Sequence, residues 1–217
     1  MRKYRKTEHI ENFLRSTYVG DALFSDIFLY NDSIPEINYD EIDTSVNFLN
    51  KKINFPLMIN AMTGGSNLSE EINRDLARVA REFNLPMAVG SQTIALEDED
   101  SRKSFEIVRE IIDDGIVISN LSGFCSVEDA KKAVDLLSAD AIQIHLNPAQ
   151  ELVQVEGERN FSGILKNVEE IVKKSEVPVI VKEVGFGMSP KTVKKLYDLG
   201  VRYVDISGYG GTNFLEI

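Results

Sequence analysis

Six strand-like apolar runs recur along this chain, separated by helical patterns, and each ends in a polar or glycine-bearing turn. The runs cover residues 57–62, 87–90, 116–119, 141–146, 178–182 and 203–206. Strands that alternate with helices at this spacing predict a parallel α/β sheet, and both an open doubly wound sheet and a closed barrel satisfy that pattern. We expect a (β/α)8 TIM barrel, truncated after about six βα units, because only a glycine-rich turn separates the sixth run from Ile217.

The segment before the first run has a different character. Residues 1–55 are expected to form an N-terminal arm and hairpin that cap the barrel, whereas residues 56–217 form the partial barrel itself. Within the first part, alternating apolar residues flank a turn in residues 46–55, which predicts a hairpin that plugs the barrel floor.

Helix signals lie between the strand runs. A helix over about residues 68–83 is expected to carry one apolar stripe, made of Ile72, Leu76, Val79, Ala80 and Phe83. Ser126 and Ser189 are predicted N-caps of later helices, and Gly200 is expected to end the helix that Pro190 opens.

Composition limits the class of protein. With 217 residues and 43% hydrophobic content, the chain is expected to form one domain. Its formal charge of −11 argues against nucleic acid or membrane partners, so a phosphate site would have to be built locally. Cys125 is the single cysteine, which excludes an internal disulfide and fits a reducing compartment. Because no run is long enough to span a bilayer, we expect a cytoplasmic protein.

The fourth run carries the clearest site signal. Gln143, His145 and Asn147 alternate with apolar residues, so they share one face of the strand, and Gln150 and Glu151 follow directly. A polar row pointing into a barrel is costly unless each group finds a partner, and a bound polar ligand is one such partner. A core histidine with ordinary hydrogen bonds is the alternative interpretation.

Lys182 ends an otherwise apolar strand, so its ammonium group should face an anion or an electron-rich group. A salt bridge to Glu183 is the alternative, although adjacent strand residues point to opposite faces. Glycine-bearing turns follow three of the strands, at residues 63–65, 185–187 and 208–212, where backbone N–H groups could approach a ligand. Their spacing matches neither a Rossmann fingerprint nor a P-loop.

Arg5, Lys6 and His9 form a cationic cluster near the amino terminus of an acidic chain. Such a cluster is commonly a solvated tail. The functional alternative is an arm that folds over the barrel mouth and holds a diphosphate, for which Arg supplies bidentate donors.

Taken together, several segments resemble type 2 isopentenyl-diphosphate delta-isomerases, which are FMN-dependent barrel enzymes that interconvert isopentenyl and dimethylallyl diphosphates. The segments are residues 5–10, 61–65, 90–92, 143–147 with Gln150 and Glu151, 182–187, and 205–214. By this resemblance the FMN contacts are Ala61, Met62, Thr63, Gly64, Ser91, Asn120, Lys182 and Thr212. The substrate-binding residues are Arg5, Lys6, His9, Ser91, Gln92 and Gln150, the catalytic residues are Gln150, His145 and Asn147, and the Mg²⁺ ligand is Glu151.

The resemblance also implies a reaction of isoprenoid biosynthesis. A proton is added at one end of the alkene and another is removed from the neighbouring carbon, with reduced FMN as acid and base and NAD(P)H as the reductant. Gln150 would orient the substrate, because an amide is a weak acid and a weak base. Members of this family tend to form homo-oligomers.

Two features depart from the resemblance. Thr93 stands where many members have arginine, and the two further strands whose loops hold the flavin phosphate are not present in the chain. We therefore expect the 217-residue chain alone to bind FMN weakly, and tight stoichiometric flavin binding in a titration would contradict this. Two other functions stay open, an FMN-dependent hydroxy-acid oxidase or dehydrogenase and a non-catalytic fragment that serves as a binding or assembly subunit.

Overall fold

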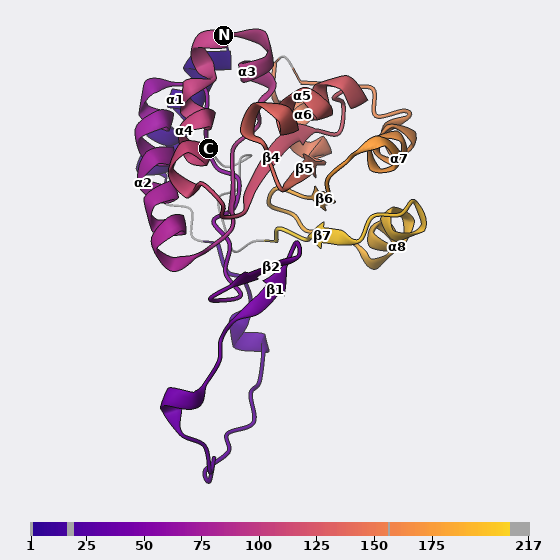
Figure 1. Cartoon of the computed structure of the whole chain (residues 1–217). Helices are drawn as coiled ribbons and strands as arrows, with labels where there is room; N and C mark the ends of the chain where they lie inside the picture. Colours follow the sequence, from indigo (N-terminus) through magenta and orange to yellow (C-terminus); the bar gives the residue numbers. More distant parts are fainter. Residues whose placement is uncertain (1, 17–19, 156, 209–217) are drawn as a thin grey trace.

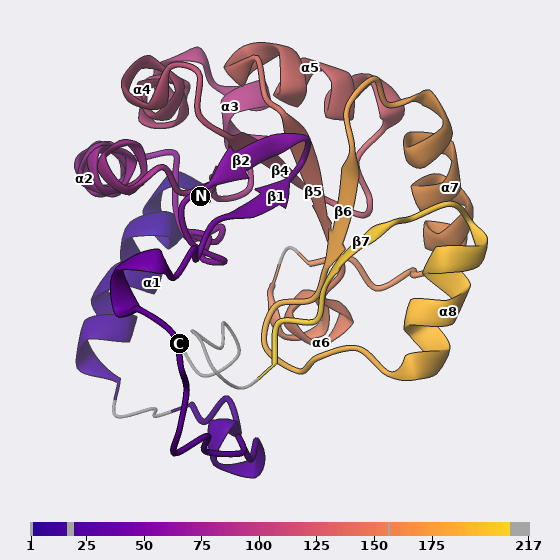
Figure 2. The ribbon, with the colours of Figure 1, turned by 60° about the horizontal axis from the view of Figure 1, so that its bottom comes forward.

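The computed structural model describes residues 2–16, 20–155 and 157–208, with residues 2–6 described by their backbone alone. Its centre is a parallel sheet with the strand order β3-β4-β5-β6-β7. These strands are β3 (Met87–Ala88), β4 (Val117–Ser122), β5 (Ala141–His145), β6 (Val179–Lys182) and β7 (Tyr203–Asp205). The order follows the sequence without a reversal, and the sheet curls with helices along its outer side (Figure 2). This winding is that of a barrel and differs from a doubly wound sheet, in which the strand order reverses.

Helices separate the strands and cover the outer side of the curl (Figure 1). The covering helices are α2 (Asn67–Phe83), α4 (Lys103–Ile112), α5 (Val127–Leu137), α7 (Ile164–Lys174) and α8 (Pro190–Asp198) (Figure 2). The remaining helices are α1 (Arg2–Arg15), α3 (Thr93–Glu97) and α6 (Pro148–Val153), with single 3-10 turns at Phe24–Asp26, Tyr39–Glu41 and Glu99–Ser101. Ser126 caps α5 in a reciprocal capping box with Asp129, and Ser189 caps α8. Gly200 follows α8 with a φ of 101°, so all three predicted helix signals are confirmed.

The first predicted run, residues 57–62, is not a regular strand. It makes one isolated parallel bridge between Ile59 and Met87. In this bridge Ile59 N–H donates to the Pro86 carbonyl and Ala88 N–H donates to the Ile59 carbonyl. A further main-chain hydrogen bond, from Gly90 N–H to the Thr63 carbonyl, extends the pairing. The run therefore lies in the first strand position of the barrel, although its neighbour β3 is too short to form a longer ladder.

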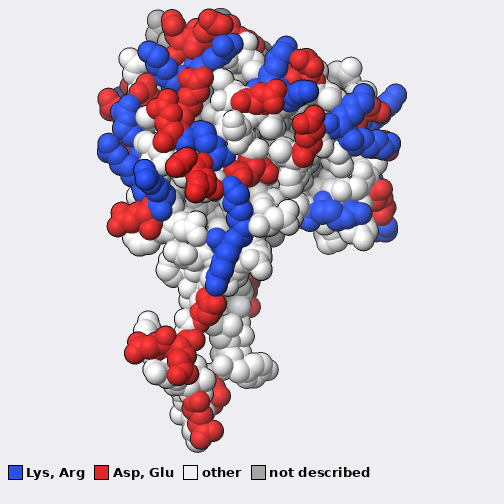
Figure 3. Space-filling view, in the orientation of Figure 1, with Lys and Arg blue, Asp and Glu red and all other residues white. Residues whose placement is uncertain are grey.

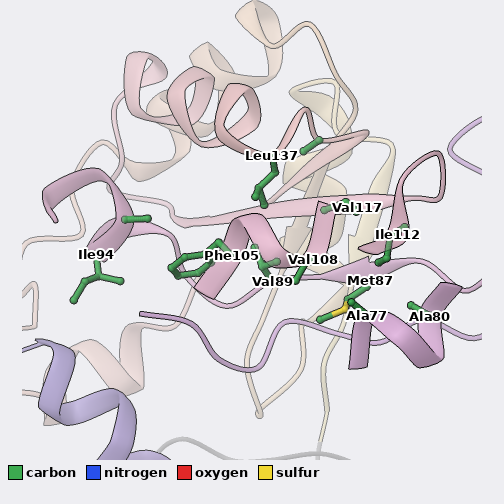
Figure 4. Packing of buried hydrophobic residues seen from close by; sticks show 12 residues of the cluster. Ala77, Ala80, Met87, Val89, Ile94, Phe105, Val108, Ile112, Val117 and Leu137 are labelled. Carbon is green, nitrogen blue, oxygen red and sulfur yellow. The ribbon is translucent and has the colours of Figure 1, made fainter. Parts of the chain in front are cut away.

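The apolar core on the outer side of the sheet lies between strands and helices. Its first part joins α2 and α4 to β3 around the fully buried Phe105 (Figure 4). The predicted stripe of α2 is wrong in part, because Val79 and Phe83 are 43% and 46% exposed. The face of α2 that is buried carries small and polar residues, namely Ser69, Asn73, Ala77 and Ala80. Small side chains let α2 approach α4 closely, and this rotates the larger apolar groups outward.

The predicted hairpin is present, with β1 (Val46–Phe48) antiparallel to β2 (Lys51–Ile53). Its turn residues Leu49 and Asn50 both have positive φ, as a two-residue hairpin turn requires. Leu49 and Ile53 are buried against Ile118, Ala141 and Ile180 of the sheet, which point to the inner side of the curl. The hairpin thus fills the interior near the amino-terminal ends of the strands.

Asp140 connects this hairpin to the sheet. Its carboxylate lies 2.7 Å from Lys51 Nζ and 2.7 Å from an Arg109 guanidinium nitrogen, and it accepts a hydrogen bond from Val117 N–H. Burial raises the pKa of Asp140, but the bonds from Lys51, Val117 and Arg109 outweigh it and hold the pKa below 3.8.

We expect Asp140→Asn to lower the free energy of unfolding at pH 7 by about 1.5–3 kcal/mol, the contribution of hydrogen bonds to a charged group. A carboxyl with a lowered folded pKa stabilises above its unfolded pKa, so the wild-type advantage should disappear as the pH falls below 3.8. Urea unfolding of both proteins from pH 7 to pH 3 measures this, with the exposed Asp75→Asn as a control. An advantage that does not change with pH would contradict the proposed charge pairing.

The arm before the hairpin extends away from the body of the protein (Figure 1). Residues 20–45 contain acidic residues but no lysine or arginine, and acidic side chains mark this arm in Figure 3. Several of its large apolar side chains are exposed, including Phe28, Leu29 and Tyr30 at 81%, 82% and 93%. Within the described ranges, no helix has the length and apolar character needed to cross a membrane.

Candidate active site

Polarity increases along the inner side of the sheet toward the carboxyl ends of the strands. The last inward-facing row is Ser122, His145, Lys182 and Asp205, which are register partners on four neighbouring strands. One layer deeper, Asn120 of β4 pairs in register with Gln143 of β5. Deeper still, the row becomes apolar and meets the hairpin. The sheet therefore presents polar groups at the mouth, where barrel enzymes hold their ligands.

A cavity of about 580 Å³ opens at this mouth, within the range of small-molecule sites. It is lined by residues from the carboxyl ends of the strands, by His9 of α1 and by residues of α6. The predicted site residues among its lining are His9, Ala61, Met62, Ser91, Asn120, His145, Asn147, Gln150, Glu151 and Lys182. The structure thus brings together side chains from distant parts of the sequence.

Some predicted contacts lie elsewhere. Gln92 is fully buried, and its amide bonds to the Ala133 carbonyl and to Asn120 N–H, so it supports the sheet and does not line the cavity. Thr63 is buried with its hydroxyl on Ser69 Oγ. Gly64 packs on Phe105, whose ring atoms a Cβ would meet at 2.1 Å.

Three other predicted residues fall outside what the structure describes. The side chains of Arg5 and Lys6 are not described, although their backbone belongs to α1, and Thr212 lies beyond the described residues.

Helix α6 and Asn147, the residue before it, present three polar side chains at the end of β5. Pro148 begins the helix directly after Asn147, which places Gln150 and Glu151 in the first turn above the strand. Asn147 Nδ2 donates to Gln150 Oε1, whereas the buried Asn147 Oδ1 has no hydrogen-bond partner among the described residues. A buried acceptor without a donor is costly, so this atom is suited to a donor on a bound ligand.

Lys182 is only 4% exposed, and Nζ donates to the main-chain carbonyl of Glu183 at 2.6 Å. Burial lowers the pKa of Lys182 below 10.5, and the charges of Asp205 and Glu183 partly oppose that shift. The Glu183 carboxylate accepts hydrogen bonds from the N–H groups of Gly185, Phe186 and Gly187 instead. The alternative considered from the sequence, a salt bridge between Lys182 and the Glu183 carboxylate, is therefore not formed, because both side chains bond to main-chain groups instead.

The described lining of the cavity carries little positive charge. Lys182 is its one lysine or arginine, against the carboxylates of Glu97, Asp129, Glu151 and Glu158. The described residues contain no group of three or more His, Cys, Asp or Glu side chains placed to hold a metal ion. A cation at Glu151 would need most of its ligands from water and a bound anion, which is the usual situation for Mg²⁺.

Cys125 also lines the cavity but is not suited to nucleophilic chemistry. Burial, helped by the nearby Asp129 charge, raises the pKa of this thiol to about 12. Because the thiolate is the reactive form, Cys125 stays a neutral, inert group at pH 7.

Comparison with known proteins connects this geometry to a family. The isopentenyl-diphosphate delta-isomerase of Listeria monocytogenes serovar 1/2a is 46% identical over 218 residues, which cover 100% of this chain. The chain is a homologue of the isopentenyl-diphosphate delta-isomerases. Proteins of the same name from Geobacillus sp. and Bacillus licheniformis are also 46% identical over 217 residues. The chain spans 61% to 62% of the length of these isomerases, and no protein-family model matches it.

Solved structures support the fold of this isomerase homologue. A mandelate oxidase variant with a C4a-OH-FMN adduct has a TM-score of 0.54 at 11% identity, over 99% of this chain and 64% of that chain. A second mandelate oxidase structure has a TM-score of 0.53 at 12% identity, over 93% and 59% of the two chains. At these identities the likeness concerns the fold, which is the predicted α/β barrel.

Asn60, which lines the cavity, and Asp205, which bonds to it, were not among the predicted site residues. Asn60 joins Gln143 to Asp205 by hydrogen bonds of 3.0 and 2.6 Å. The sequence feature that could have indicated them is a single polar residue within each of two apolar runs, residues 57–62 and 203–206, at positions that face inward.

Proposed function

We propose that this protein isomerises isopentenyl diphosphate to dimethylallyl diphosphate, a step of isoprenoid biosynthesis, using reduced FMN and Mg²⁺. The observation that carries this proposal is 46% identity, along the whole chain, to proteins named for that reaction. The cavity at the carboxyl ends of the strands supports it, because it joins polar groups on β4, β5, β6 and α6.

The donor set around the cavity fits a flavin. Lys182 is a buried cation, and a cation stabilises the negative charge that reduced flavin carries near N1 and O2. Asn120 lines the cavity with its amide held by Gln143 and His145, and the segment at Ala61 and Met62 offers a surface for an apolar ring system. When bound, reduced FMN supplies the acid and base for alkene protonation, and NAD(P)H is the proposed reductant. The FMN adduct in the mandelate oxidase structure is consistent with this use of the fold.

The chain's own residues would bind and orient the substrate. Gln150 is held beside the substrate space by its hydrogen bond from Asn147 Nδ2, whereas the buried acceptor Asn147 Oδ1 is suited to an N–H or O–H donor of the flavin, because the ionised substrate has none. His145 and Asn120 form the wall next to this pair. We assign His9, together with Arg5 and Lys6, to the diphosphate, because α1 brings His9 to the mouth. Closing the mouth would exclude water from a cationic transition state.

Glu151 is the proposed Mg²⁺ ligand. Its Oε2 accepts Glu158 N–H at 2.8 Å, which fixes the carboxylate at the cavity wall. Mg²⁺ would neutralise the diphosphate in a cavity whose described carboxylates outnumber its cations.

Anaerobic turnover in D₂O tests the proposal. With FMN, NAD(P)H and Mg²⁺ present, we expect isopentenyl diphosphate to convert to dimethylallyl diphosphate with deuterium incorporation, followed by NMR. An otherwise identical reaction with a 2-hydroxy acid and an electron acceptor tests the oxidase alternative. Oxidation of the hydroxy acid, or no turnover by folded protein with bound FMN, would contradict the isomerase proposal.

Glu151→Gln should raise the Mg²⁺ concentration for half-maximal turnover by roughly 10- to 100-fold, because the amide lacks the ligand's charge. Glu158→Gln is the matched control, since it changes a nearby carboxylate and keeps the main-chain bond to Glu151. A Mg²⁺ titration of both variants compares them. Equal shifts in the two variants would show that the effect is general electrostatics and not a ligand role for Glu151.

A further inference from the structure

A continuous chain of side-chain hydrogen bonds crosses the inner side of the sheet beneath the cavity. Its members come from the first strand position and from β4, β5 and β7, and they are Asp205, Asn60, Gln143, Asn120 and His145. The successive donor–acceptor distances are 2.6, 3.0, 3.1 and 2.9 Å. Asn120 is 2% exposed and Gln143 is fully buried, so water does not readily substitute for these bonds.

Two hydrogen bonds determine the orientation of the Asn60 side-chain amide. Asn60 Nδ2 donates to the Asp205 carboxylate, which when ionised can only accept. Asn60 Oδ1 accepts from Ala61 N–H at 2.8 Å, and a main-chain N–H can only donate. Turning this amide by 180° would place two acceptors together at Asp205 and two donors together at Ala61.

The remaining orientations follow in order. Asn60 Oδ1 requires a donor from Gln143, which therefore presents Nε2 to Asn60 and Oε1 to Asn120. Asn120 then presents Nδ2 to Gln143 and Oδ1 to the His145 ring. Because an amide oxygen only accepts, the His145 Nδ1 atom at 2.9 Å must carry a hydrogen.

We propose that Asn60 and Gln143 are positioning residues that fix His145 as the Nδ1–H tautomer. In the neutral ring the lone pair is then on Nε2, which becomes the nitrogen able to accept a proton or a hydrogen bond. His145 lines the cavity, so this tautomer determines what the ring offers to a ligand. Its use in isomerisation rests on the proposed function, whereas the tautomer itself rests only on the hydrogen-bond chain.

Nitrogen NMR of the ligand-free protein tests the inference. The chain has only two histidines, so ¹⁵N-histidine labelling with His9→Gln assigns the His145 ring directly. At a pH where the ring is neutral, we expect a pyrrole-type Nδ1 resonance and a pyridine-type Nε2 resonance. A pyridine-type Nδ1 resonance with a pyrrole-type Nε2 resonance would overturn the proposal. Because this measurement uses the unsubstituted hydrogen-bond chain, such a result could not be attributed to a mutation within it.

Two substitutions of Gln143 separate positioning from packing. Gln143→Leu removes the acceptor that orients Asn120, so the Asn120 amide can turn and we expect the Nε2–H tautomer to appear. Gln143→Glu retains an acceptor oxygen for Asn120 Nδ2 and, as the protonated acid, a donor for Asn60 Oδ1, so the Nδ1–H pattern should persist. An unchanged tautomer in folded Gln143→Leu would overturn the proposal. If the NMR pattern is as expected but the protein has no isomerase activity, the proposed function is contradicted and the inferred His145 tautomer is still supported.

Discussion

Lys182→Met is expected to reduce isomerisation roughly 10²- to 10³-fold, the usual loss when one electrostatic stabiliser of a reaction centre is removed. The folded protein should be no less stable. Lys182 is buried, and its one described hydrogen bond goes to a main-chain carbonyl. Replacing a desolvated charge with an apolar side chain of similar length is often neutral or stabilising.

The pH dependence of stability gives this prediction a second readout. Burial lowers the folded pKa of Lys182 below 10.5, so between the folded pKa and 10.5 the unfolded chain binds more protons than the folded chain. The free energy of unfolding of the wild type should therefore rise with pH across that window, relative to Lys182→Met. The desolvation cost is fully present below the folded pKa and is lost above 10.5.

Urea unfolding at several pH values and anaerobic turnover at one pH measure the two effects. Lys195→Met, which changes an exposed lysine of α8, is the matched control for the loss of one positive charge. Turnover in Lys182→Met close to that of the control would contradict the proposed flavin contact of Lys182. A fall in stability at neutral pH would contradict the desolvation argument.

The second large effect concerns the core between α2, α4 and β3. Phe105→Ala is expected to lower the free energy of unfolding by about 3–5 kcal/mol, the range for buried aromatic residues. Phe105 is fully buried within this cluster (Figure 4). Its ring also fills the space beside Gly64, so the surroundings cannot collapse into the cavity without moving the turn at residues 63–65.

Phe83→Ala is the control, because it removes the same atoms from a side chain that is 46% exposed. Urea unfolding should give a midpoint shift for Phe105→Ala several times larger than for Phe83→Ala, with similar slopes. Similar shifts for the two variants would mean that the α2 face predicted from the sequence, and not the face in the structure, meets the core.

The comparison of Phe83 with Phe105 illustrates what periodicity could and could not predict. The apolar repeat in residues 68–83 correctly predicted a helix, because spacing determines which residues share a face. It predicted the buried face only in part, because Ala80 and Leu76 of the predicted stripe reach the core whereas Val79 and Phe83 are exposed, and Ser69, Asn73 and Ala77 are buried instead. Which face of α2 is buried depends on how α2 packs against α4, and the sequence of residues 68–83 contains no information about α4.

The site residues likewise include some whose role could be predicted from the sequence and others whose orientation could not. Gln143, His145 and Asn147 were recognisable in the sequence, because polar residues at alternate positions of a buried strand require partners. Gln92 belonged to the same resemblance, yet its amide is used to hold Ala133 and Asn120. Whether a polar side chain at the end of a strand faces the ligand or the scaffold depends on local backbone direction.

By itself, the sequence determined the order of strands and helices, the helix caps at Ser126 and Ser189, and the polar residues available for a site. Those properties follow from residue spacing and from local hydrogen bonds between near neighbours. Only the tertiary structure decided that Asn60 and Asp205, 145 positions apart, share a hydrogen bond and orient the amides beneath His145. Such contacts depend on how the sheet curls, and curling is a property of the packed strands together.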